Sequence, residues 1–86
     1  MSRGIWNLEP ASELEVLVRW ELDEPDMAVR NRVRAFLDGL LIQPLGHGQQ
    51  DVPGIYWEVV PRTDVTLVWT LDVDRRLIVL ALVGRD

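Results

Sequence analysis

The chain has 86 residues, enough for one hydrophobic core and too few for two domains. Hydrophobic residues make up 48% and charged residues 27%, which excludes an intrinsically disordered chain, and the net charge of −5 argues against a general nucleic-acid binder. The absence of cysteine excludes disulfides and thiolate metal sites. We expect a single domain over residues 1–86. Because the sequence shows neither a signal-peptide core nor an apolar run of about 20 residues, we expect it to be cytoplasmic.

Residues 11–24 fit either a strand or a helix. Apolar and charged side chains alternate there, which is the two-residue period of a strand, and the β-branched and aromatic residues among them favour a pleated surface. Leu17 breaks this alternation and completes a helical face. Ser12 and Glu15 also have the spacing of a helix capping box. The choice stays open, with a preference for a strand.

The next segment predicts a helix that begins after Asp26, a suitable N-cap, and ends before Pro44. Gly39 lies inside this helix, where it costs about 1 kcal/mol relative to alanine, and so indicates a close approach to another element. One apolar stripe at helical spacing is formed by Val29, Val33, Phe36, Leu37, Leu40 and Leu41.

The C-terminal half predicts a loop followed by three strands. Residues 45–54 hold three glycines and one proline, which is typical of a loop. Strands are expected at 55–60, 65–71 and 77–83, and their short links predict an antiparallel meander. The third strand is apolar at every position, which predicts burial on both faces. We therefore predict an α+β fold, an antiparallel sheet with a C-terminal three-stranded meander packed against one or two helices.

This C-terminal half resembles the RelE/ParE superfamily of toxin–antitoxin toxins. The family's succession of aromatic strand, aspartate turn, second strand, acidic turn, apolar strand and final basic residue is matched by Tyr56, Arg62-Thr63-Asp64, Trp69, Asp72-Val73-Asp74, Leu77 to Val83, and Gly84-Arg85. Upstream, the stretch from Phe36 to the pair Pro53-Gly54 resembles the family's helix end and following loop. The family's first strand matches either residues 6–11 or residues 16–22.

The resemblance implies a toxin or toxin homologue that acts through protein binding and is neutralised by an antitoxin. A non-toxic homodimeric interaction module on the same fold is the alternative, and a weak ribosome-dependent RNase is a second one. The candidate partners are therefore an antitoxin and a second copy of the chain. We expect no membrane contact, and no contact with nucleic acid except through the ribosome.

An RNase activity would depend on cations. RelE-type relatives use a cluster of basic residues and a late tyrosine or histidine, because stabilising the charge at a scissile phosphate without a metal requires positive groups. Here the family's mid-strand arginine falls at Thr66, and the chain has no lysine. Arg62 and Arg85 remain at or near matching positions and are the candidate catalytic residues. Since most of the cluster is missing, the prediction leans against an enzyme.

Four residues are candidates for binding a protein partner. Trp57 and Trp69 are expected on adjacent antiparallel strands, where they would pack across the strands or anchor a partner. Arg30 and Arg34 are four residues apart and share a helix face. His47, the single histidine, has no evident orienting partner. The acidic clusters lack the spacing of a calcium loop, so we expect no metal and no cofactor.

Overall fold

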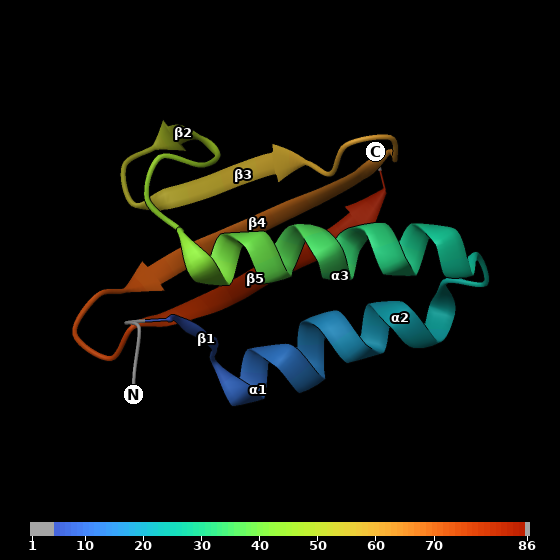
Figure 1. Ribbon diagram of the computed structural model, residues 1–86, viewed down its shortest axis with the longest axis horizontal. Helices are drawn as coiled ribbons and strands as arrows, with labels where there is room; N and C mark the ends of the chain where they lie inside the picture. The colour runs from blue at the N-terminus through green and yellow to red at the C-terminus, as the bar shows by residue number, and fades with distance from the viewer. Residues whose placement is uncertain (1–4, 86) are drawn as a thin grey trace.

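The computed structural model describes residues 5–85. Five strands form one sheet in the order β1-β5-β4-β3-β2, in which every pair is antiparallel except β1 with β5 (Figure 1). The predicted α+β fold and its C-terminal meander are confirmed. In chain order the elements are β1 (Asn7–Leu8), α1 (Pro10–Ser12), the π-helical η1 (Glu13–Val18), α2 (Arg19–Asp23), α3 (Met27–Ile42), β2 (Gln49–Val52), β3 (Ile55–Val59), β4 (Val65–Asp72) and β5 (Leu77–Arg85).

The preference for a strand over residues 11–24 was wrong, because this segment is helical from Pro10 to Asp23. Its N-cap is Glu9, whose carboxylate accepts the backbone N–H of Ser12 at 2.7 Å. The Ser12 hydroxyl, in turn, accepts the N–H of Leu80 from β5 at 3.1 Å. Leu17 is fully buried, so the residue that broke the alternation is the one that faces the core. Of the two matches to the family's first strand, the earlier one contains β1.

α3 begins and ends close to the predicted positions. Asp26 is its N-cap and accepts the backbone N–H of Ala28 at 2.9 Å. Gly39 has nothing within 4 Å of the position of a Cβ atom, so the expected close approach is wrong. The buried residues of the helix are Val29, Val33, Leu37 and Leu40.

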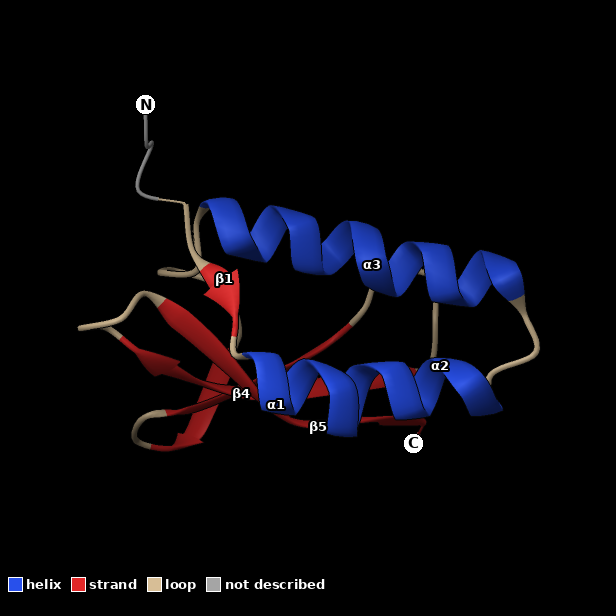
Figure 2. Cartoon of the chain, turned by 90° about the horizontal axis from the view of Figure 1, so that it is seen from below, coloured by secondary structure: helices blue, strands red, loops and turns tan. Residues whose placement is uncertain are grey.

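The core lies between the sheet and its helical cover. Figure 2 shows α3 over the sheet and the segment α1–α2 running beside β5, with the opposite face of the sheet uncovered by any described segment. The core residues from the strands alternate along β4 as Val65, Leu67 and Trp69, all with no exposed surface. The sheet is therefore a half-covered one, with a core face and an open face.

Two predictions about the C-terminal half need correction. The expected loop of residues 45–54 contains the edge strand β2, which pairs with β3 across a tight turn at Pro53 and Gly54. The expected burial of both faces of the last strand is also wrong. In β5, Ile78 and Leu80 face the core, whereas Leu82 is 52% exposed on the open face. None of the described helices is long and apolar enough to cross a membrane.

Candidate functional site

The open face of the sheet carries side chains without charge across its central rows. Strand register places Trp57 opposite Val68 and Val68 opposite Leu82, so these three residues form one row across three strands. A second row consists of Val59, Thr66 and Gly84, and a third of Thr70 and Val79. The side chains in these rows are apolar or carry a hydroxyl group, and none of them is a cation. The arrangement therefore suits contact with another apolar protein surface.

The two tryptophans predicted to pack together lie on opposite faces. Tyr56 is the residue opposite Trp69, and its ring stacks on the indole with centroids 6.1 Å apart. Phe36 of α3 meets the same indole edge-on at 6.3 Å. Trp69 has no exposed surface, so in this structure it is a core residue and presents no ring to a partner. Trp57 is partly exposed on the open face, where it remains a candidate anchor.

Arg34 is held by carboxylates of the preceding helical segment. Its Nε donates to Glu21 at 2.7 Å and its Nη2 donates to the same carboxylate at 2.8 Å. Its Nη1 lies 3.6 Å from Glu13. The hydrogen bonds to Glu21 raise the pKa of Arg34 above its ordinary value. Arg34 therefore ties α3 to η1 and α2.

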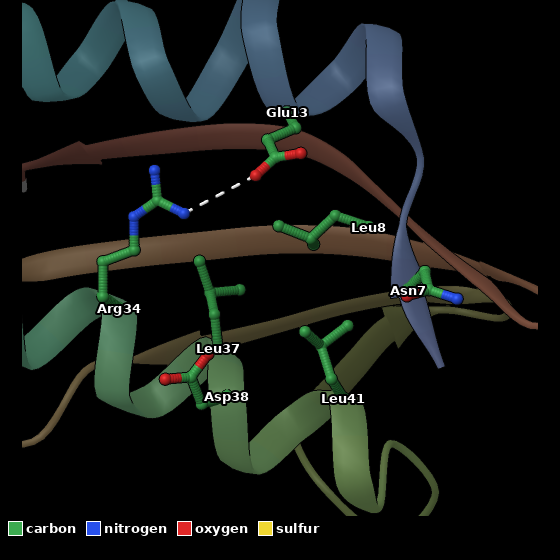
Figure 3. A pocket seen from close by; sticks show the side chains of 7 residues that line it. All are labelled: Asn7, Leu8, Glu13, Arg34, Leu37, Asp38 and Leu41. Atoms are coloured by element: carbon green, nitrogen blue, oxygen red, sulfur yellow. Dashed lines mark ion pairs between the residues drawn. The ribbon is translucent and has the colours of Figure 1, made fainter. Parts of the chain in front are cut away.

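A hollow of about 250 Å³ lies beside this ion pair. Figure 3 shows Leu8, Leu37 and Leu41 beneath it, while Arg34 and Glu13 face one another at its edge. Because the cation is already paired, the hollow offers no free charge to an anionic ligand. Arg30, one turn before Arg34, has no ion-pair partner within residues 5–85.

The candidate catalytic residues Arg62 and Arg85 lie at the same end of the sheet, but within residues 5–85 only Arg85 forms ion pairs there. Arg85 donates to Glu24 through Nε at 3.1 Å and Nη2 at 2.8 Å, and to both oxygens of Asp64 at 2.9 and 3.1 Å. The hydrogen bonds to Glu24 are the largest cause that raises the pKa of Arg85. Arg62 is exposed in the turn between β3 and β4, with a φ of 62°. Arg85 is thus neutralised by two carboxylates, which leaves Arg62 as the free cation of the two.

The ion pair of Glu24 with Arg85 is a feature of this end of the sheet that the sequence does not reveal. Its side chain is 4% exposed, and it joins the end of α2 to the last strand through Arg85. The acidic cluster around Glu24 predicts the start of a helix, and for Asp26 that prediction is correct. No local spacing identifies the partner of Glu24, because Arg85 lies 61 residues away in sequence.

No group of three or more histidine, aspartate or glutamate side chains within the described residues is placed to hold a metal ion. His47 is exposed in the loop between α3 and β2, and no described residue orients its ring. His47 therefore lacks the oriented geometry that a general base needs.

Comparison with known proteins identifies the fold. No protein-family model matches the sequence, and no curated protein does. Among solved structures, the isolated RelE toxin of E. coli is similar, with a TM-score of 0.69 and 15% sequence identity. The similarity covers 94% of this chain and 83% of that one. At this identity the likeness concerns the fold alone, and the chain has a RelE-like α+β fold.

Proposed function

We propose that this chain is a RelE-like toxin or toxin homologue that acts by binding a protein, and that an antitoxin partner neutralises it. The fold similarity to the E. coli RelE toxin supports the class. The uncharged central rows of the open face support the mode of action, and they are the observation on which the proposal chiefly rests. An apolar face of this kind suits a protein partner, with Trp57 as its central anchor.

The distribution of arginines counts against RNA cleavage as the main activity. Arg85 is engaged by Glu24 and Asp64, and Thr66 stands where the family's mid-strand arginine is expected. Of the two arginines at or near positions that match the family, Arg62 alone is without an ion pair among residues 5–85, and one cation is a poor substitute for a cluster aimed at a phosphate. If the chain nevertheless cleaves RNA through these arginines, the double variant Arg62→Ala and Arg85→Ala loses that activity. Cleavage that survives both substitutions removes these two residues from the reaction.

The test of the proposal is the growth of a bacterial culture after expression of this chain alone. We expect growth arrest, without new mRNA ends. Substituting Leu82→Lys places a charge in the row of Trp57 and should relieve the arrest. The matched control is Leu14→Lys, since Leu14 is 66% exposed on η1 and lies outside the sheet. Relief by both variants, or by neither, contradicts the role of the open face.

A homodimeric interaction module is the second candidate, and the same face favours it. Two copies of these uncharged central rows can meet without contact between like charges, although each chain carries a net charge of −5. Normal growth together with soluble, dimeric protein favours this candidate over the first. Sedimentation of the wild type and of Leu82→Lys then tests it, because the charged variant should be monomeric if the open face is the interface.

A further inference from the structure

Two arginines without an ion-pair partner among residues 5–85 flank one hollow at the end of the sheet. They are Arg32, on the exposed side of α3, and Arg62, in the turn after β3. The hollow between them has a volume of about 250 Å³, comparable to one large side chain with part of its backbone. Its lining residues are Arg32, Ala35, Phe36, Val60, Pro61 and Arg62.

The charge of this hollow differs from that of three others on the molecule. Each of those combines an arginine with at least one carboxylate: Arg34 with Glu13 and Asp38, Arg30 and Arg34 with Glu21, and Arg19 with Glu15 and Asp23. The hollow at Arg32 and Arg62 has two arginines and no acidic residue among its lining residues. In a chain with a net charge of −5, this lining is locally basic.

The other lining residues of the hollow are apolar, and two of them pack into or against the core. Phe36 packs against the core and contacts the buried indole of Trp69. Val60 is fully buried beneath the turn, and Pro61 restricts the backbone beside it. A ligand that fits this surface needs an apolar group for the floor and an anionic group for the arginines.

We propose that this hollow binds an acidic side chain flanked by an apolar one, both presented by a segment of a protein partner. Arg62 and Arg32 receive the carboxylate, since arginine donates planar, charge-assisted hydrogen bonds to carboxylates. The apolar neighbour covers Phe36 and Pro61. The proposal rests on the proposed function in one respect, that the chain acts by binding a protein, but it concerns a surface separate from the open face.

A protein segment fits better than a nucleic acid for two reasons. Binding to nucleic acid draws its affinity from many phosphate contacts, whereas this site offers two cations on an acidic protein. The floor also lacks polar groups that would read the edge of a base, because its side chains are Ala35, Phe36, Val60 and Pro61. A carboxylate next to an apolar side chain would contact both the arginines and the apolar floor of the hollow.

The variants that test the site can be chosen to keep the fold. Arg62 has a φ of 62°, and asparagine tolerates this left-handed conformation, so Arg62→Asn removes the charge without new backbone strain. Arg76→Asn is its matched control, because Arg76 has a φ of 54° in the turn between β4 and β5 and lines none of the four hollows described above. On the helices, Arg32→Gln is the test and Arg19→Gln is the control.

The measurement is a titration of the isotope-labelled chain with two blocked tetrapeptides, followed by NMR. One has the sequence glutamate-leucine-glutamate-phenylalanine, and the other replaces both glutamates with glutamine. We expect the acidic peptide to shift the amide signals of Arg32, Phe36 and Arg62, and added salt at about 0.5 M to weaken its binding. Arg32→Gln and Arg62→Asn should each weaken binding by about threefold or more, and the two controls should leave it unchanged.

Equal binding of the glutamine peptide overturns the proposal, as does a response that spares the hollow or a preference for oligouridylate over the acidic peptide. The variant Leu82→Lys separates this proposal from the function proposed above. It should bind the acidic peptide like the wild type even if it no longer arrests growth. Loss of peptide binding in Leu82→Lys would place the site on the open face instead.

Discussion

Gly48 lies against the indole ring of Trp69, where a Cβ atom on the glycine would sit 2.9 Å from both Cη2 and Cζ2. Gly48 has a φ of 81°, and its N–H donates to Glu58 at 3.0 Å. The ring cannot easily move, because it is fully buried and stacked on Tyr56. The loop before β2 is therefore fixed by a core residue of β4.

Gly48→Ala should lower the free energy of unfolding by about 2 kcal/mol or more, since it adds a left-handed alanine and overpacks the core. Urea denaturation checks this value. The double variant with Trp69→Phe should lose less than the sum of the two single losses, because the smaller ring leaves room for the methyl group. Strict additivity of the two losses would show that the contact between Gly48 and Trp69 is not the cause.

Gly39→Ala, unlike Gly48→Ala, should stabilise the fold. Gly39 lies within α3, and no atom beyond its chain neighbours and the nearby backbone of the helix lies within 4 Å of the position of its missing Cβ. Alanine there should raise the free energy of unfolding by about 0.5–1 kcal/mol through higher helix propensity. Thermal unfolding of Gly39→Ala beside the wild type measures the difference, and a lower midpoint for the variant would refute the expectation.

Ser12 connects the first helical segment to the sheet. Its hydroxyl donates to the carbonyl of Glu9 at 2.9 Å and accepts the buried N–H of Leu80 at 3.1 Å. Ser12→Ala leaves that N–H without its partner, so we expect a loss of about 1–3 kcal/mol in the free energy of unfolding. Hydrogen exchange at the amide of Leu80 should accelerate in the variant. Unchanged exchange and unchanged stability together would mean that this hydrogen bond contributes nothing.

Glu24 should make stability depend on pH in the acidic range. The guanidinium of Arg85 first, and the N–H of Asp26 second, hold the pKa of Glu24 below its ordinary value of 4.5. A carboxyl whose pKa is lowered by folding adds stability that is present above pH 4.5 and is lost as the pH falls through the folded-state pKa. Glu24→Gln should therefore lower stability at neutral pH and reduce the loss of stability on acidification.

Chemical denaturation across the acidic pH range measures this effect, with Glu15→Gln as the control. Glu15 is exposed on η1 and forms no ion pair in the part of the chain that the structure describes. The control should follow the wild-type curve. If Glu24→Gln follows it too, the pair with Arg85 does not stabilise the fold.

Where local chemistry decides the structure, the sequence predicts it. α3 follows from an apolar stripe and the N-cap Asp26, and the meander follows from β-rich runs joined by short turns. Residues 11–24 fit both the two-residue period of a strand and the spacing of a helical face. The helix there therefore depends on contacts distant in sequence, such as Ser12 with Leu80. β2 has no apolar pattern, because all four of its residues are exposed.

The candidate site was less predictable for the same reason. Strand register decides which face a tryptophan takes, and it places Tyr56, not Trp57, opposite Trp69. The pair of Arg32 and Arg62 forms where a helix meets a turn, and no spacing along the chain indicates it. The lack of cations in the strand stretches 55–59, 65–72 and 77–84, by contrast, can be read directly in the sequence.

Growth of cultures that express the wild type, Leu82→Lys or Leu14→Lys, with mRNA ends mapped in the same samples, tests the central claim most directly. We predict arrest by the wild type and by Leu14→Lys, relief by Leu82→Lys, and no new mRNA ends in any culture. New mRNA ends together with full arrest by Leu82→Lys would contradict an action through protein binding at the open face.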